Sequence, residues 1–271
     1  MAYPSIAGFA RLADGSVGAT RRIAGQSTGI TRASHDVTYD AVNDEIVVAA
    51  ANAQALLTFR GGADGDTAPI RVIQGPSTQL MMPGQGNTVD AVHNEIFVVE
   101  GRDRPGLEYI LVFPRTGKGD VAPIRVIGGP DTMLKNARNI VVDPLRNLIA
   151  VSSNNGVLIF NRTDTGNAKP RAILKGPSGK FRLIESKGYL VSSRGGGGGG
   201  DDAGVGGVTR EVRGGSISVW SITDNGKVPP LFEMTSPKGM EGGDVALNPN
   251  NKEVLIGGRL AVEVYSFPEI F

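Results

Sequence analysis

The apolar residues of this chain come in short runs separated by Gly, Pro, Asn and Asp. The runs are rich in Val, Ile and Phe, as at 45–48, 95–99, 110–113 and 157–160. Short runs of β-branched and aromatic residues between turn residues are typical of β-strands. No long segment has the apolar spacing of an amphipathic helix. The pattern therefore predicts an all-β protein made of many short strands.

One phrase returns along the chain with little change. Residues 68–78 read Ala-Pro-Ile-Arg-Val-Ile-Gln-Gly-Pro-Ser-Thr, and residues 122–132 read Ala-Pro-Ile-Arg-Val-Ile-Gly-Gly-Pro-Asp-Thr. Weaker copies lie at 20–25, 169–177 and 230–234. After each copy the sequence predicts a strand ending in an acidic or amide residue, a turn, and further strands. A repeated phrase of this kind indicates one structural unit used several times.

The repeat unit contains four predicted strands, which we call a, b, c and d in chain order. Its length is about 40 to 60 residues, which suits the blades of a propeller. The spacing is measured between landmark residues near the end of strand a: Asp40, Asp90, Asp143, Glu185 and Asn248. Tandem four-stranded units with short turns predict a single β-propeller domain over residues 1–271, because each blade buries its faces against its neighbours.

We expect about five blades, with six as the alternative. The first predicted strands are a c and a d strand, and the last are a, b and c. Residues 21–24 are therefore expected to give the last blade its strand d, a Velcro-type closure by the N-terminal strand. This leaves the strand Ile6–Phe9 surplus. It is an extra edge strand, part of an incomplete sixth blade, or an edge for strand exchange between subunits.

The sequence resembles the NHL-repeat and lactonase-like propeller proteins over nearly its whole length. The resemblance rests on Gly-Pro-x-Thr before an apolar strand that ends in Asp, followed by Asn-Glu-Ile, and on strand–aromatic–turn phrases such as 217–226. It implies a fold and not an activity, because such propellers include lyases, hydrolases, scaffolds and ligand binders.

Candidate ligand-binding residues lie in the loops that join strand d to the next strand a. Aligning the repeats places five residues at equivalent positions just before strand a: Asp36, Gly86, Asn139, Phe181 and Asp244. The flanking positions add polar side chains, of which we predict Gln85, Asn87, Arg138 and Lys180 to bind a ligand. Arg194 joins them because it begins a glycine-rich b–c loop, which lacks the glycine spacing of a phosphate-binding loop. That loop lies on the same predicted face and can act as a lid.

A metal site is a second expectation for this face. Carboxylate and amide oxygens are the ligands that Ca²⁺ prefers, so Asp36, Asn139 and Asp244 are candidate ligands for Ca²⁺ or another divalent cation. The lactonase-like resemblance implies a similar set of acidic and amide ligands. The competing interpretation is that these residues cap tight turns. His35 adjoins Asp36 and is the candidate general base.

Other polar residues are predicted to be structural. Asp40, Asp90 and Asp143 recur in the blades, which favours turn stabilisation over catalysis. His93 is expected to be solvated. Arg71 and Arg125 are expected to protect an exposed outer strand against aggregation. The aromatic residues near the end of strand c are expected to pack between blades: Phe59, Phe113, Phe160, Trp220 and Tyr265.

Composition narrows the range of functions. The 28 basic and 27 acidic residues nearly cancel, so nothing favours nucleic acid or an anionic membrane. The chain has no Cys, which excludes disulfides and thiolate chemistry. There is no signal-peptide pattern at the start. We expect a soluble, cytoplasmic protein, with an exported protein as the alternative.

Three functions follow from these residues. The first is a noncatalytic binding propeller that holds a small ligand or peptide on its axial loop face. The second is a metal-dependent lactonase-like hydrolase or lyase, in which the cation polarises an ester carbonyl and activates water. The third is an assembly protein that forms homo-oligomers through the surplus strand Ile6–Phe9.

Overall fold

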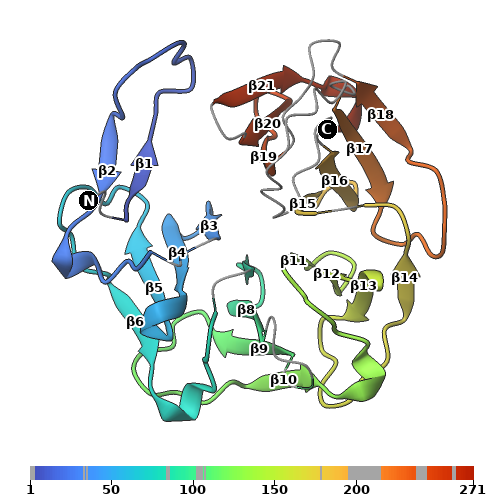
Figure 1. Ribbon diagram of the computed structural model, residues 1–271, viewed down its shortest axis with the longest axis horizontal. Coiled ribbons are helices and arrows are strands. Elements are labelled where there is room, and N and C mark those ends of the chain that lie inside the picture. The colour runs from blue at the N-terminus through green and yellow to red at the C-terminus, as the bar shows by residue number, and fades with distance from the viewer. Residues whose placement is uncertain are drawn as a thin grey trace, which may run out of the picture. The chain divides into compact units, whose positions relative to one another are not determined.

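The computed structural model describes residues 4–32, 34, 36–83, 86–101, 106, 108–177, 179–194, 215–235, 243–257 and 261–271. Its regular structure consists of the strands β1 to β21 and a few short 3-10 turns (Figure 1). The strands are antiparallel within their sheets. Among the described helical turns, none has the length and hydropathy needed to cross a membrane. The all-β class predicted from the sequence is confirmed.

Four sheets have four strands each, in chain order. They are β3 (Val37–Asp40), β4 (Glu45–Ala50), β5 (Ala55–Arg60) and β6 (Arg71–Gln74); β7 (Asn87–Asp90), β8 (Glu95–Glu100), β9 (Tyr109–Pro114) and β10 (Arg125–Gly128); β11 (Ile140–Asp143), β12 (Leu148–Ser153), β13 (Gly156–Asn161) and β14 (Ala172–Leu174); and β15 (Phe181–Ile184), β16 (Tyr189–Arg194), β17 (Ser216–Ser221) and β18 (Phe232–Thr235).

Two smaller sheets complete the described strands. One contains β19 (Asp244–Asn248), β20 (Glu253–Gly257) and β21 (Val262–Ser266), and the other contains β1 (Ile6–Gly8) and β2 (Arg21–Ile23). The four-stranded sheets and the sheet β19–β21 are the blades of a five-bladed β-propeller, as predicted. The pair β1–β2 is additional to them.

The chain divides into two compact units, which we describe separately. Unit 1 contains Met1–Ile140 and Asp164–Ala168, and unit 2 contains Val141–Thr163 and Lys169–Phe271. In unit 1, β2 pairs with β1, and in unit 2, β21 pairs with β20. The predicted closure of the last blade by residues 21–24 would join the two units, so it stays a prediction, as does the single domain.

The repeated Gly-Pro-x-Thr phrase forms the link from one sheet to the next. In unit 1, Ile23, Ile73 and Ile127 form parallel bridges with Gly65, Gly119 and Gly166. Just after each outer strand, a glycine is held at a φ of 135°, 138° or 127°: Gly25, Gly75 and Gly129. A Cβ at Gly75 would lie 2.5 Å from the Asp120 side chain, whose carboxylate accepts the Ser77 N–H at 2.7 Å. Only glycine fits this backbone and this close approach.

Apolar side chains pack between successive sheets. In unit 1 one cluster joins β4 and β5 to β8 and β9, with Val47, Leu56, Ile96 and Phe113 among its members. A second cluster covers the opposite face of β4 and β5 and includes Ile23 of β2. The aromatic residues predicted to pack between blades are buried at Phe59, Phe113, Phe160 and Trp220 and partly buried at Tyr265.

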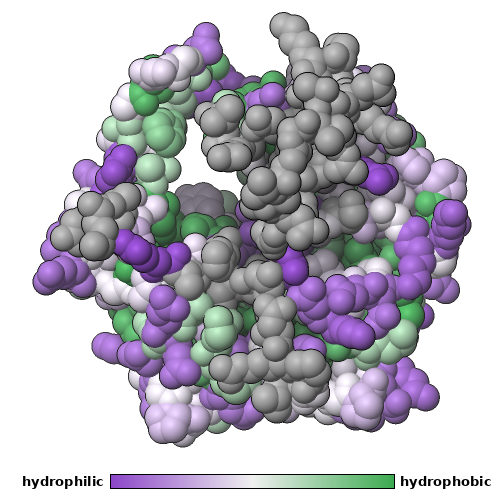
Figure 2. Space-filling view, viewed as in Figure 1, coloured by the Kyte–Doolittle hydropathy of each residue, from purple (hydrophilic) through white to green (hydrophobic). Residues whose placement is uncertain are grey.

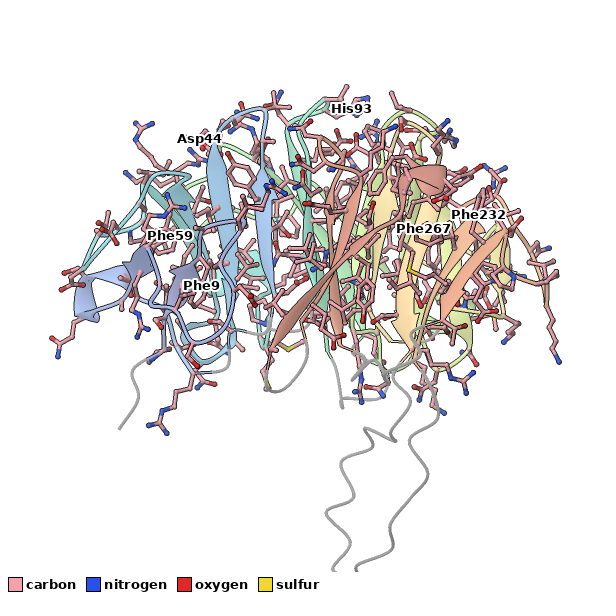
Figure 3. The ribbon with its side chains drawn as sticks, turned by 90° about the horizontal axis from the view of Figure 1, so that it is seen from above. Phe9, Asp44, Phe59, His93, Phe232 and Phe267 are labelled. Carbon is pink, nitrogen blue, oxygen red and sulfur yellow. The ribbon has the colours of Figure 1, made fainter. Side chains whose placement is uncertain are left out.

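The recurring Asp residues stabilise the turns between the first two strands of a blade, as predicted. The carboxylates of Asp40, Asp90 and Asp143 are buried and accept backbone N–H groups two or three residues ahead, at 2.9 to 3.1 Å. His93 is exposed, as predicted, and its Nδ1 lies 2.7 Å from Asp90 Oδ2. Figure 3 shows His93 and Asp44 on the same edge of unit 1, where these turns lie.

The outer-strand arginines form ion pairs that the sequence did not indicate, and their predicted protection against aggregation stays a prediction. Arg71 forms an ion pair with Glu45, and Arg125 forms a bidentate pair with Glu95 at 2.7 and 2.8 Å. Each arginine reaches from the outer strand to the start of the second strand of its own blade. Arg115 adds a link between blades, because its guanidinium lies 2.7 Å from Glu45. These side chains are paired and largely buried, so they hold the strands together.

Candidate functional site

Three of the predicted binding residues lie together in unit 1, at the starts of β3, β7 and β11. The backbone N–H of Asn87 donates to Asp36 Oδ2 at 3.1 Å, and Asn87 Nδ2 donates to the Asp36 carbonyl at 3.3 Å. Gly86 packs so closely on the next loop that an added Cβ would lie 2.9 Å from the Asn139 Cα. The loops before these three strands are therefore contiguous, as the repeat alignment predicts.

The group is buried and rich in hydrogen-bond acceptors. Asp36 is 3% exposed and Asn87 is 2% exposed, and Asn139 is fully buried. Asn87 Oδ1 has no hydrogen-bond partner within the described residues. A buried amide oxygen without a partner loses the hydrogen bonds that water would supply. This oxygen is therefore a buried acceptor without a donor among the described residues.

Sequence reasoning missed one member of this group. Glu100 ends β8, is buried, and accepts the Met82 N–H at 3.0 Å through Oε2. Strand β8 lies beside β7, and the Val99 N–H donates to the Gly86 carbonyl at 3.0 Å. The signal in the sequence was a carboxylate at the end of the apolar run 96–99. Glu100 therefore places a second buried carboxylate at the end of the sheet β7–β10 where Asn87 binds Asp36.

Two predicted residues lie in unit 2 and bind each other. Lys180 Nζ lies 2.7 Å from Asp244 Oδ2. The strand pairing also corrects the alignment, because Phe181 lies opposite Ser192 just as Val37 lies opposite Val48. Lys180 thus occupies the position that the sequence alignment gave to Phe181, which is buried in the core. The fourth blade was misaligned by one residue because its strand a ends at Ile184 and not at Glu185.

Other predicted residues contribute less to the described geometry. His35 and Gln85, and the loop after Arg194, lie outside the described residues. Arg194 ends β16 and is exposed. Arg138 is exposed beside Asn139, and its Nε lies 3.4 Å from Asn136 Oδ1.

The proposed cation ligands are divided between the two units. Asp36 and Asn139 belong to unit 1, and Asp244 belongs to unit 2, where the Lys180 ammonium competes with any cation for its carboxylate. The described residues contain no cluster of three or more His, Cys, Asp or Glu side chains suited to a metal. A cation held by the predicted ligands of unit 1 would depend on one carboxylate with amide oxygens, a set that Ca²⁺ accepts and Zn²⁺ does not favour. The metal site stays a prediction.

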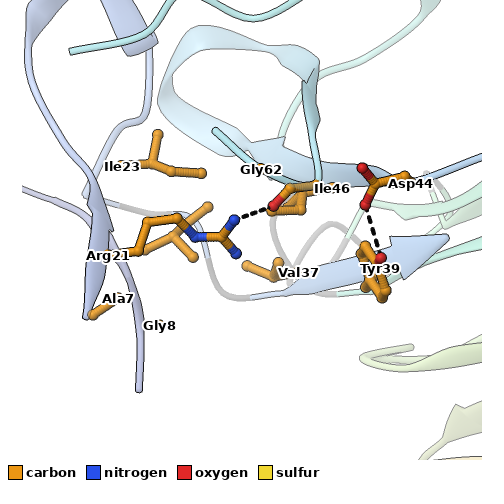
Figure 4. A pocket seen from close by; sticks show the side chains of 11 residues that line it. Ala7, Gly8, Arg21, Ile23, Val37, Tyr39, Asp44, Ile46 and Gly62 are labelled. Atoms are coloured by element: carbon orange, nitrogen blue, oxygen red, sulfur yellow. Dashed lines mark hydrogen bonds between the residues drawn. The ribbon is translucent and has the colours of Figure 1, made fainter. Parts of the chain in front are cut away.

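Unit 1 also contains a pocket that the sequence did not indicate. It has a volume of about 580 Å³ and lies between the pair β1–β2 and the first blade. Its apolar wall includes Ile6, Ile23, Val37 and Ile46, and its polar groups are Arg21, Tyr39 and Asp44. Arg21 donates to the Gly61 carbonyl, and Tyr39 Oη donates to Asp44 Oδ1 at 2.8 Å (Figure 4). This hydrogen bond to Asp44 raises the pKa of the Tyr39 hydroxyl.

Comparison with known proteins supports the fold alone. No protein-family model and no curated protein sequence matches this chain. Among solved structures it is similar to hydrazine synthase from Kuenenia stuttgartiensis, with a TM-score of 0.53 and 11% identity over 84% of this chain and 56% of that one. The WD40 domain of Toxoplasma gondii coronin gives 0.55 and 11% over 89% and 69%. A putative 6-phosphogluconolactonase from Bacteroides uniformis gives 0.52 and 14% over 94% and 71%.

Identities this low carry no activity from those proteins to this chain. The chain spans little more than half of the hydrazine synthase chain that it matches. All three similar structures are consistent with the propeller architecture read from the strand pairing. The NHL and lactonase-like labels are therefore resemblances of sequence pattern, while membership of the β-propeller fold is shown.

Proposed function

We propose that this protein is a noncatalytic binding propeller that holds a small ligand or peptide at the starts of β3, β7 and β11. The observation that carries the proposal is the buried Asn87 Oδ1, which lacks a partner within the described residues and adjoins the buried carboxylate of Asp36. Acceptors of this kind select a ligand that presents N–H donors, and an amine adds charge to the hydrogen bond.

The sequence alternative, a cation-dependent hydrolase, uses the same Asp36 and Asn139. It has less support in the geometry, because Asp244 is engaged by Lys180. The two functions differ in whether a metal must bind before the organic ligand. A binding site for amines works without a metal, whereas the hydrolase requires one before any ester can react.

Calorimetry on the chelator-treated protein with two probes, putrescine and CaCl₂, tests the proposal. We expect saturable putrescine binding that weakens about tenfold or more in Asp36→Asn, because a charge-assisted hydrogen bond is lost. Asp44→Asn is the matched control, since Asp44 lies at the opposite end of the same hairpin and should bind putrescine like the wild type. Absence of putrescine binding, or equal loss in both variants, would overturn the proposal. Saturable Ca²⁺ binding that Asp36→Asn abolishes, without amine binding, would favour the hydrolase.

A further inference from the structure

The pair β1–β2 sits against the first blade as the outer half of another blade. Ile23 bridges Gly65 as Ile73 bridges Gly119, and the Arg22 carbonyl accepts the Gly65 N–H at 2.9 Å as Val72 accepts that of Gly119 at 2.7 Å. β2 therefore corresponds to the outer strands β6 and β10, and β1 corresponds to β5 and β9. In those blades a second strand, β4 or β8, pairs with the other edge of that strand.

Within unit 1, no described strand occupies the equivalent position at the other edge of β1. β1 pairs only with β2 among the described strands, and the pocket of about 580 Å³ occupies that position. The floor is unusually exposed for an inner strand, with Val37 at 41% and Tyr39 at 57%. Figure 2 shows hydrophobic residues at the surface of the β1–β2 hairpin, where Phe9 is 55% exposed. An open strand edge next to apolar side chains is the geometry used for strand addition.

Arg21 specifies the charge of the missing strand. By the same bridges it is equivalent to Arg71 and Arg125, each of which binds a glutamate at the start of the second strand. In the pocket, Arg21 donates a hydrogen bond to the Gly61 carbonyl. A strand entering beside β1 with an acidic residue in the position of Glu45 would bring a carboxylate to this guanidinium.

We propose that this pocket binds an extended peptide segment of a partner protein, which adds to the edge of β1 and places a Glu or Asp at Arg21. The apolar side chains of the segment alternate, so that one face packs on Val37 and Ile46. Self-pairing of β1 between two copies, the assembly expected from the sequence, fits less well, because Ile6-Ala7-Gly8 carries no carboxylate. This site is separate from the amine site proposed above.

The probe is a capped peptide with the sequence of residues 44–50, Asp-Glu-Ile-Val-Val-Ala-Ala, which fills the equivalent place in the first blade. Fluorescence anisotropy should show saturable binding of the labelled peptide. Replacing its Glu by Gln should weaken binding about tenfold, the loss expected for one charge-assisted hydrogen bond. Arg21→Gln should give a similar loss, while Arg22→Gln, on the exposed face of the same strand, should bind like the wild type.

A second pair of variants does not touch the β1–β2 pair and so guards against its unfolding. Val37→Asp places a negative charge on the pocket floor and should abolish binding, whereas Val42→Asp, in an exposed turn, should not. Equal binding of the Glu and Gln peptides, or no binding by the wild type, would overturn the proposal. Hydrogen-exchange protection, without peptide, of a β1 amide that does not donate to β2 would also overturn it, because another strand would then occupy the edge. Gel filtration would show whether that strand comes from a second copy.

Discussion

The sheets β3–β6 and β7–β10 have nearly the same sequence pattern, yet one face differs in its surroundings. The face of β7–β10 that contains Ile96 packs against β4 and β5. Within unit 1, the equivalent face of β3–β6, which contains Ile46, meets β2 and β1 and borders the pocket.

The difference appears most clearly on the innermost strands. Val37 is 41% exposed, whereas Asn87, its equivalent in β7, is 2% exposed although it is polar. Burial at this position is therefore set by the neighbouring sheet and not by the hydrophobicity of the residue. A propeller blade is stable only as far as its neighbours cover it, so an uncovered blade face is a place where a partner can bind.

The largest expected effect comes from truncating the same residue on the two faces. Ile96→Ala should lower the free energy of unfolding by about 3 kcal/mol, because a cavity forms in a closed core. Ile46→Ala should cost about half as much, since the open pocket already borders its side chain. Urea denaturation of both variants of the full chain measures the difference. Equal losses would indicate that the face of β3–β6 is covered in solution.

A smaller effect is expected from the ion pairs of Glu45, one within its own sheet and one with Arg115 of the next sheet. Burial by itself raises the pKa of Glu45, but hydrogen bonds from Arg71 and Arg115 outweigh it and hold this pKa below its ordinary value. A lowered pKa in the folded state means that the pairs stabilise the protein at neutral pH. That contribution is lost as the pH falls from the unfolded value of 4.5 through the folded pKa.

Glu45→Gln should therefore lower the free energy of unfolding by about 1 to 2 kcal/mol at pH 7. Its deficit relative to the wild type should shrink as the pH falls below the usual glutamate range, because the wild-type carboxylate is then protonated as well. Thermal unfolding across an acid pH series measures this. A deficit that stays constant with pH would show that the loss comes from packing and not from charge.

The smallest effect concerns the pKa of Tyr39, which lines the pocket. Because the hydrogen bond to Asp44 raises the pKa of Tyr39, this tyrosine should ionise at higher pH than a solvated one. Asp44→Asn should bring its titration back towards the ordinary value. The ultraviolet absorbance change of the wild type minus that of Tyr39→Phe isolates this residue among the five tyrosines. An unshifted titration in the wild type would show that the Tyr39–Asp44 bond does not persist in solution.

Much of the candidate site followed from the repeat pattern. The landmark Asp residues fixed the starts of β3, β7 and β11, so Asp36, Asn87 and Asn139 were expected together. The fourth blade was misaligned because Ile184 has no acidic side chain to mark the end of its strand. Glu100 was missed because nothing in an apolar strand's sequence tells whether its last carboxylate faces a loop or solvent.

The sequence by itself determined the class of fold, the four-stranded repeat, the turn-forming Asp residues and the aromatic packing layer. These features depend on local turn chemistry and on alternation along a strand, which are written within a few residues. Only the tertiary structure decided that Arg71 and Arg125 bind glutamates two strands away, that Lys180 engages Asp244, and that a pocket lies beside β1. Those outcomes depend on which strands become neighbours in space, and residues distant along the chain acquire that relation only when the sheets pack.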